Sequence, residues 1–230
     1  MDTVLNLGMP SKDLCHTFEL IQPVSPKIRL KITGVEVHIG LNIQMTSPVY
    51  GAGMTLDCLE EMLRNGFLAA HDKVVMVGSM GSLNETIRIG DVVLPNPSRC
   101  AYYGYQEHEL VQNPGLLSAL QAELTEDGIA ATTYKHGSSF AVFDPHTDHA
   151  SYTSSLYDEL VKGVDCGEVF VGLEFACRSN LRVGAVLYCS DGADRHISAI
   201  DTKEFDRRAA EFDHRLNRVA VRAIRRSRHP

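Results

Sequence analysis

Short apolar runs alternate with helix-like segments along this 230-residue chain, and that alternation constrains the fold more than any other feature. Strand-like runs fall at 4–7, 28–48, 74–77, 91–94, 132–143 and 183–189. Helical patterns are expected at 11–20, 54–70, 113–128, 150–163, 168–180 and 202–226. Such alternation predicts a mostly parallel sheet covered by helices. Because no repeat or linker interrupts it, residues 1–230 are expected to form a single α/β domain.

The composition is that of a soluble globular protein, with 44% hydrophobic and 22% charged residues. The amino terminus has no basic leader, and no apolar run is long enough to span a membrane. The six cysteines form no C-x-x-C pair and several lie in apolar runs, which favours buried, reduced thiols. We therefore expect a cytoplasmic protein that does not bind membranes.

The net charge of −7 argues against nucleic acid as a partner. One local exception is a run of eight arginines between Arg207 and Arg228, at the end of the helix expected at 202–226. Acidic residues are interleaved in the first half of that helix. The pattern favours a solvated helix face over a binding surface.

Four loops that follow expected strands are candidates for a site, because ligands of such sheets gather at the carboxyl ends of strands. They span 8–13, 51–53, 77–82 and 190–194. The first could hold an anion on backbone amides or be a simple turn into a helix. The glycines from Gly78 to Gly81 are expected to turn the chain. In the last loop, Asp191 could act as a general acid or cap a helix.

Cofactor and metal sites are not expected. The Gly51-Ala52-Gly53 loop lacks the third glycine of a dinucleotide motif, since that position is Leu56. An H-x-x-H cluster at His146 and His149 has no Cys/His set with zinc spacing beside it. Polar loop residues in contact with solvent explain the cluster better.

Taken together, the loop motifs resemble the nucleoside phosphorylase and nucleosidase superfamily. The segments that carry the resemblance lie in the family's order and are 8–10, 51–53, 77–83 (VGSMGSL), 87–95 (IRIGDVVLP), 164–168 (VDCGE) and 190–191 (SD). The likeness spans about residues 4–224. It implies a twisted, partly barrelled mixed sheet flanked by helices, and a homo-oligomer with its active site near a subunit interface.

The resemblance also implies roles for particular residues. Glu168 matches the glutamate that holds the ribose hydroxyls, and Asp191 matches the acid that assists departure of the purine base. Ser79 and Gly8 match contacts to the nucleophile or its pocket. Phe140, or alternatively Phe143, matches the aromatic surface near the sugar or base.

Two further positions are expected to border the substrate. Gly53 belongs to the glycine motif that allows close backbone approach. Cys166 stands where the family usually has a methionine over the sugar, in a motif one residue longer than usual.

Departures from the phosphorylase pattern favour attack by water. Met76 stands where those enzymes have an arginine that grips phosphate, and a thioether supplies no charged donors. Lys12 replaces a second arginine and remains a candidate contact to the substrate or its anion. Asp13 falls where nucleosidases of the methylthioadenosine type place a water-activating glutamate.

The leading hypothesis is a nucleosidase that cleaves the N-glycosidic bond of a purine-type nucleoside, with Asp191 and Asp13 as catalytic residues. The first alternative is a phosphate-dependent phosphorylase that uses Lys12 and Ser79, aided by Lys27 or Arg29 from a neighbouring subunit. The second is a non-catalytic nucleoside-binding protein on the same fold.

Overall fold

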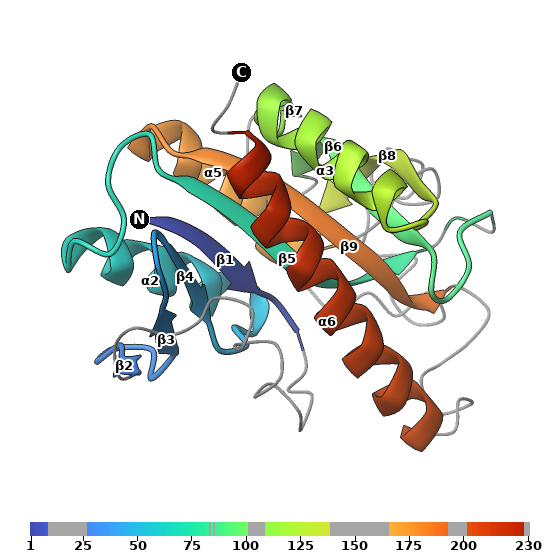
Figure 1. Ribbon diagram of the computed structural model, residues 1–230, viewed down its shortest axis with the longest axis horizontal. Coiled ribbons are helices and arrows are strands. Elements are labelled where there is room, and N and C mark those ends of the chain that lie inside the picture. Colours follow the sequence, from blue (N-terminus) through green and yellow to red (C-terminus); the bar gives the residue numbers. More distant parts are fainter. Residues whose placement is uncertain are drawn as a thin grey trace, which may run out of the picture.

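The computed structural model describes residues 1–8, 27–82, 84, 86–100, 109–138, 166–192 and 202–227 (Figure 1). The strands are β1 (Asp2–Asn6), β2 (Ile28–Arg29), β3 (Glu36–Ile39), β4 (Ile43–Thr46), β5 (Lys73–Ser82), β6 (Val92–Cys100), β7 (Glu109–Leu110), β8 (Ala131–Ser138) and β9 (Arg182–Gly192). The helices are α2 (Gly51–Arg64), α3 (Pro114–Glu126), α5 (Gly167–Ser179) and α6 (Thr202–Arg226).

All of these strands belong to one mixed sheet, in the order β2-β3-β4-β1-β5-β9-β6-β7, with β8 also paired to β6. The central strands β4, β1, β5 and β9 run parallel to one another. Antiparallel pairs form at the β2-β3-β4 end and where β6 meets β7 and β9. The four parallel strands therefore end at the same edge of the sheet.

Helices cover the sheet in two layers, one on each face. Along β5, Val74 and Met76 pack with α2 and α5, whereas Val75 and Val77 pack with α3 and α6. Both sets are buried because successive strand residues point to opposite faces of a sheet that is covered on both. Figure 1 shows α6 lying across one of these faces.

The turn expected at Gly78 to Gly81 is wrong, since β5 continues through Ser82 and pairs with β9 along its length. The glycine at Gly78 serves close packing instead, because a Cβ there would overlap the carbonyl oxygen of Leu7. Leu7 in turn donates its amide to the Val77 carbonyl at 2.6 Å. The small residue lets the end of β1 lie tightly against β5.

The described helices lie close to their expected positions, and the bounds of α6 are those predicted. α2 begins three residues earlier than expected, at Gly51, whose φ of +73° is readily adopted by glycine. Its N-cap residue Tyr50 makes no side-chain capping bond, so the usual sequence signal for a helix start is missing. The helices expected at 11–20 and 150–163 lie outside the described residues.

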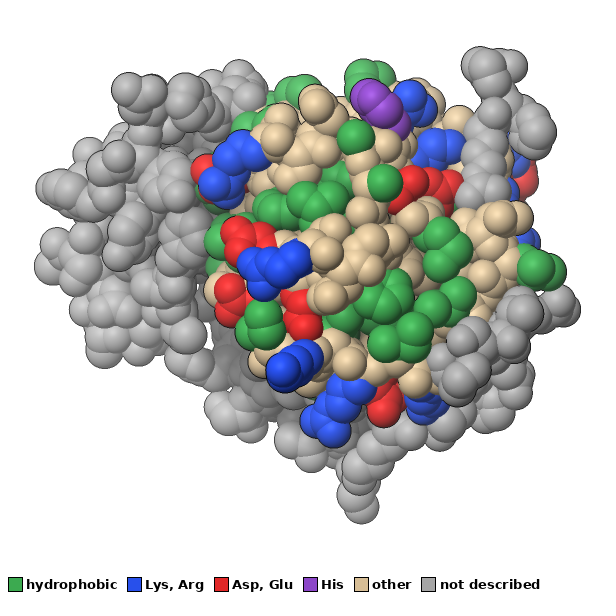
Figure 2. All heavy atoms as spheres, turned by 90° about the vertical axis from the view of Figure 1, so that its left-hand side faces the viewer, with side chains coloured by type: hydrophobic (Ala, Val, Ile, Leu, Met, Phe, Trp, Pro, Cys, Tyr) green, Lys and Arg blue, Asp and Glu red, His purple; other side chains and the backbone are tan. Residues whose placement is uncertain are grey.

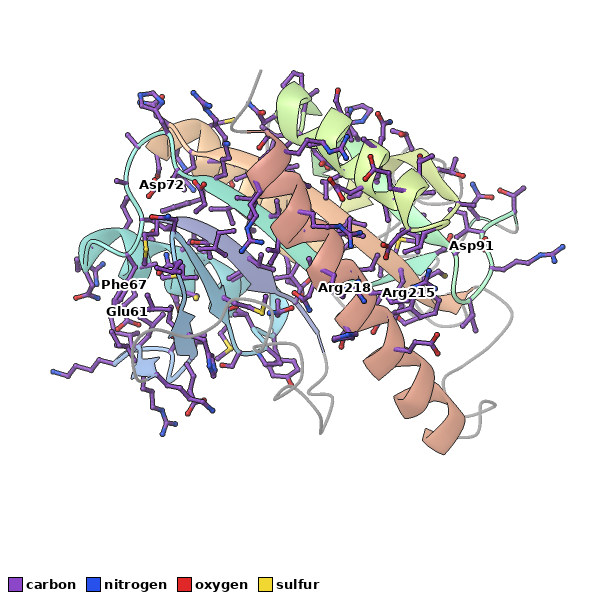
Figure 3. All side chains as sticks on the ribbon, in the orientation of Figure 1. Glu61, Phe67, Asp72, Asp91, Arg215 and Arg218 are labelled. Carbon is purple, nitrogen blue, oxygen red and sulfur yellow. The ribbon has the colours of Figure 1, made fainter. Side chains whose placement is uncertain are left out.

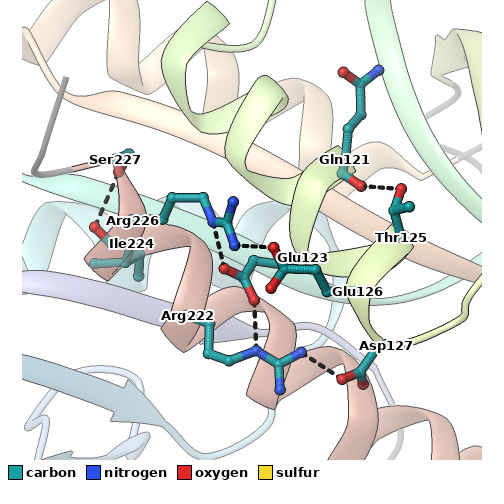
Figure 4. Close-up of polar contacts among 9 residues, drawn as sticks. All are labelled: Gln121, Glu123, Thr125, Glu126, Asp127, Arg222, Ile224, Arg226 and Ser227. Carbon is teal, nitrogen blue, oxygen red and sulfur yellow. Dashed lines mark hydrogen bonds and ion pairs between the residues drawn. The ribbon is translucent and has the colours of Figure 1, made fainter.

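The expected solvated face of α6 is confirmed in part, since Arg218 and Arg225 are exposed, but two other arginines also bind a neighbouring helix. Arg222 and Arg226 each donate from Nε to the buried carboxylate of Glu123 on α3, at 2.7 Å in both cases. Arg222 also pairs with Asp127 at 2.6 Å, and Arg226 with Glu126 (Figure 4). These arginines join two helices. The local pattern of acidic and basic residues could not predict these contacts, because the acidic partners lie about a hundred residues earlier in the chain.

A second buried carboxylate holds a turn against α2. Glu61, 2% exposed, accepts hydrogen bonds from the amides of Lys31 (2.6 Å), Ile32 (3.0 Å) and Thr33 (3.2 Å). Burial works to raise the pKa of the Glu61 carboxyl, but these bonds and one from the Thr33 hydroxyl lower that pKa below its ordinary value. Figure 3 labels Glu61 on the α2 side of the molecule.

Charges of both signs are interspersed on that side of the molecule, with hydrophobic side chains between them (Figure 2). That face carries no broad field of one sign. Of the described helices, none is both long and apolar enough to cross a membrane. Among the described cysteines, Cys58, Cys166 and Cys189 are buried and Cys177 is exposed, and these four form no disulfide.

Candidate active site

The candidate site lies where the parallel strands end. Gly8 follows β1, Gly51 follows β4, and Ser79 and Asp191 lie toward the carboxyl ends of β5 and β9. A bridge between Leu7 and Val49 keeps the first two segments together beyond their strands. The parallel pairing thus brings four loops from distant parts of the sequence to one edge.

Gly8 and Ser79 are neighbours at this edge. A Cβ built on Gly8 would lie 3.3 Å from the Ser79 hydroxyl oxygen and 3.7 Å from its amide nitrogen. Gly8 has a φ of +112°, which glycine adopts without strain, and donates its amide to the Val49 carbonyl at 3.2 Å. The partly exposed Ser79 therefore has its hydroxyl beside the bare backbone of Gly8, where a side chain at position 8 would be in close contact with it.

Asp191 is placed by an irregularity in the pairing of β5 with β9. The register shifts between Met80 and Gly81, so that Gly81 lies opposite Asp191. The hydroxyl of Ser190, 7% exposed, donates to the Met80 carbonyl at 3.1 Å and supports this shift. The Ser190 hydroxyl is therefore bonded within the sheet. The backbone of Asp191 lies at the edge of the candidate site, and its side chain lies outside what the structure describes.

Glu168 caps α2 from the start of α5. Its Oε1 accepts the amide of Gly51 at 2.8 Å, a contact between residues 117 positions apart. Glu168 also lies in the first turn of its own helix. Because helix N-termini carry partial positive charge, two of them favour a negative carboxylate at this point. This capping bond brings the glycine loop and the predicted ribose-binding glutamate together.

Cys166 approaches the other oxygen of the same carboxylate. Its thiol donates to Glu168 Oε2 across 3.4 Å. The Cys166 side chain is 5% exposed and belongs to the core cluster under α2 and α5. The thiol is thus directed at the carboxylate from the protein side, while Glu168 itself stays half-buried.

Met76 lies in the core. It is fully buried and packs against α5, where a Cβ on Gly172 would come within 2.5 Å of its sulfur. The position that is an arginine in the phosphorylase pattern is therefore a packing position in this chain. Nothing charged reaches the site from it.

Several expected site residues lie outside the described residues: Lys12, Asp13, Phe140 and the alternative Phe143. The H-x-x-H cluster at His146 and His149 also falls there. Across the described residues, no group of three or more His, Cys, Asp or Glu side chains could hold a metal ion. Gly53 is the third residue of α2, exposed, with open space where a Cβ would lie.

Two features of the site were missed by sequence reasoning. One is the contact between the Gly51 amide of the glycine motif and Glu168, which the sequence did not indicate. Tyr50, directly before Gly51, exposes 42% of its surface and is the N-cap residue of α2. Burial, followed by the negative charge of Asp213, raises the pKa of the Tyr50 hydroxyl, which therefore stays protonated at neutral pH. An aromatic residue next to a glycine loop was the available signal.

Comparison with solved structures gives the fold. The 5′-methylthioadenosine/S-adenosyl homocysteine nucleosidase of Campylobacter jejuni superposes with a TM-score of 0.74 at 12% identity, covering 96% of this chain and 99% of that one. Futalosine hydrolase of Helicobacter pylori, solved as a mutant, gives 0.70 at 14% identity, covering 96% and 99%. Purine nucleoside phosphorylase of Toxoplasma gondii gives 0.71 at 15% identity, covering 96% and 89%.

The fold expected from the sequence motifs is therefore confirmed: the chain has the mixed, helix-flanked sheet of nucleosidases and nucleoside phosphorylases. No family model matches the sequence. No curated protein matches it either. The similarity to these solved structures therefore lies in the three-dimensional fold. The sequence identities are too low to show the reaction, which has to be argued from the residues of the site.

Proposed function

We propose that this protein is a nucleosidase, which cleaves the N-glycosidic bond of a purine-type nucleoside by attack of water at the anomeric carbon. The proposal starts from a fold shared with enzymes that break this bond by two routes, hydrolysis and phosphorolysis. The choice between the routes and the identity of the substrate rest on the chain's own residues.

The observation that carries the proposal is the Glu168 carboxylate at the sheet edge. It is half-buried, held at Oε1 by the Gly51 amide and placed beside the N-termini of α2 and α5. A carboxylate has about four acceptor positions, so it can still accept two hydroxyl protons. A vicinal diol such as that of ribose fits this requirement.

Hydrolysis rather than phosphorolysis is supported by Met76. Tight binding of phosphate in a site uses charged, preferably bidentate donors. At this position the chain has a thioether, fully buried against α5. Water needs no such donors, so the loss of the arginine is compatible with a hydrolase.

In the proposed reaction, the bond from the anomeric carbon to the base nitrogen breaks and its electron pair leaves with the base. Asp191 donates a proton or hydrogen bond to the departing base, which lowers the charge it carries. Asp13 orients the water, whose oxygen bonds to the anomeric carbon and whose proton is lost to solvent. Glu168 holds the sugar hydroxyls throughout. The products are free base and free sugar.

The phosphorylase alternative draws on a different observation, the Ser79 hydroxyl beside the bare backbone of Gly8. Together with Lys12 it offers donors for an anion. The other two basic residues proposed for phosphate binding, Lys27 and Arg29, already have partners near β2 and β3. Lys27 pairs with Glu36 at 3.3 Å, and Arg29 donates from Nε to the Gly34 carbonyl at 3.2 Å.

The test is to incubate the protein with purine and pyrimidine nucleosides, with and without phosphate, in water enriched in ¹⁸O. We expect free base without phosphate, and one ¹⁸O atom in the released sugar. Release that requires phosphate and yields sugar 1-phosphate would replace the proposal with the phosphorylase.

Variants assign the roles. Asp191→Asn is expected to abolish release of base, whereas Asp91→Asn should leave it unchanged. Asp91 is a matched control because its exposed carboxylate serves a turn, accepting the Arg88 amide at 2.8 Å. Absence of base from every nucleoside, together with a rise in melting temperature on adding one, would support the binding-protein alternative.

A further inference from the structure

Both oxygens of the Glu168 carboxylate are already held in the free protein. Oε1 accepts the Gly51 amide at 2.8 Å and Oε2 accepts the Cys166 thiol at 3.4 Å. The two donors come from the start of α2 and the residue before α5. Two bonds to two different oxygens fix the rotation of the carboxylate about its last bond, which a single bond would leave free.

The Cys166 thiol cannot cover a sugar from the solvent side. Its side chain is 5% exposed and packs in the core cluster. A methionine side chain is long enough to lie over a sugar but has no proton to donate, whereas a thiol can donate a hydrogen bond. The substitution therefore exchanges an apolar surface for a hydrogen bond to the carboxylate.

We propose that Cys166 is a positioning residue that sets the orientation of the Glu168 carboxylate and, through it, the preference for a vicinal diol over a sugar with one hydroxyl. The inference rests on the proposed function for its substrate, a ribonucleoside. With the carboxylate fixed, its two free acceptor positions face the two hydroxyls together. Once the thiol is lost, the carboxylate can rotate, and the diol loses its advantage over a single hydroxyl.

The experiment compares Cys166→Ala, which removes the donor, with Cys166→Ser, which keeps one. For a ribonucleoside, Cys166→Ala is expected to raise KM about tenfold with little change in kcat, the size of one weakened hydrogen bond. For the matching 2′-deoxyribonucleoside the rise should be about twofold or less, because only one hydroxyl depends on the orientation. Cys166→Ser should restore the ribonucleoside KM to within about twofold.

Cys177→Ala provides the control, because it removes an exposed thiol from α5, the helix that Cys166 precedes, and it should change neither KM. A purely structural role for Cys166 would lower stability in both of its variants and change both substrates alike. Equal KM values for Cys166→Ala and Cys166→Ser would overturn the inference.

A second readout does not depend on activity. The S–H stretching vibration shifts to lower frequency when the thiol donates a hydrogen bond, and Cys166→Ser identifies the band. Glu168→Gln, a weaker acceptor, should move the band toward the free value. If the protein cleaves no nucleoside, the proposed function fails. The S–H band then tests the hydrogen bond between Cys166 and Glu168 by itself. A shift of the band in Glu168→Gln supports a carboxylate positioned by the thiol, and an unchanged band overturns the inference.

Discussion

The two helical layers are held together by different means. On one face, α3 and α6 are joined by guanidinium groups, with Glu123 of α3 accepting from both Arg222 and Arg226. On the other face, α2 and α5 are joined by an uncharged donor, the Gly51 amide, bonded to Glu168. In each layer one carboxylate therefore joins the two helices, and the two carboxylates differ in their surroundings.

That difference determines what each carboxylate can do. Glu123 is 5% exposed and its charge is neutralised by two arginines, so both of its oxygens are occupied in joining the helices. Glu168 is half-buried and is contacted by an uncharged amide and a thiol, so some of its acceptor positions remain for a ligand. The comparison predicts that activity and stability respond to different carboxylates.

The largest expected effect is on activity, at Glu168. Glu168→Gln should lower kcat/KM for a ribonucleoside at least about a hundredfold, because two hydrogen bonds to a charged group are each worth about 1.5–3 kcal/mol. Stability should change by about 1 kcal/mol or less, the usual range for a helix cap. Glu174→Gln on the same helix, which breaks only a surface contact of 3.7 Å to Arg178, serves as control. Equal losses in both variants would contradict the assignment.

Next in size is the effect of Glu123→Gln on stability. Removing this buried charge leaves two arginines without their main partner, and urea unfolding should show a loss of about 2–3 kcal/mol. Glu126→Gln, at an exposed site, should cost about 0.5 kcal/mol or less. Activity per folded molecule is expected to stay unchanged in both. A fall in activity without loss of stability in Glu123→Gln would break the separation between the layers.

A smaller effect tests how closely each layer approaches the sheet. Gly172→Ala in α5 places a Cβ 2.5 Å from the Met76 sulfur, and should cost about 1–2 kcal/mol as overpacking. Met76→Val in the same chain should remove most of that cost, which a double-mutant cycle measures. The counterpart under α3 is Gly184, where a Cβ would lie 3.2 Å from Leu116 and Leu120. Because that overlap is milder, Gly184→Ala should cost less than Gly172→Ala.

The smallest expected effect concerns pH and the α6 layer. Burial raises the pKa of the Asp213 carboxyl from 3.8 to about 7, against a hydrogen bond from Tyr188 that lowers it. The folded protein thus holds a proton that the unfolded chain releases near pH 4. Its contribution to stability is complete below about pH 4 and is lost as the pH rises through about 7.

Asp213→Asn should therefore flatten the decline in melting temperature between those pH values and stabilise the protein at neutral pH by about 1 kcal/mol, a size reduced because the side chain is partly exposed. Melting curves in a pH series measure this. A parallel decline in the variant and the parent protein would assign the effect to another group.

The fold was predictable where the pattern is local. The apolar spacing of residues 202–226 gives α6 its bounds, and the apolar run at 183–189 identifies most of β9. The prediction failed where the determining contact is distant. The start of α2 has no capping side chain in its own sequence, because the cap is Glu168 from another helix. Gly78 signals a turn locally, but its role is set by the Leu7 carbonyl.

The site residues stay predictions from motif order. Motif order pointed to Glu168, Cys166, Ser79 and Gly8, and the structure places them in two separate pairs, Cys166 beside Glu168 and Gly8 beside Ser79. The Gly51 amide and the direction of the Cys166 thiol could not be predicted, because a backbone donor has no sequence signature and a side-chain direction depends on packing. The role of Asp191 remains a prediction that Asp191→Asn tests, and the role of Asp13 remains a prediction.

The pairing of β5 with β9 has a consequence for synthesis. The central strand β5 is complete once residue 82 has left the ribosome, but its neighbour on one side spans Arg182–Gly192. Until about a hundred further residues have emerged, that side of β5 has unpaired amides and carbonyls beside an apolar surface, and such edges invite aggregation. During synthesis the exposed side of β5 is therefore available to chaperones for a long interval. The candidate site cannot form before the last quarter of the chain has been made.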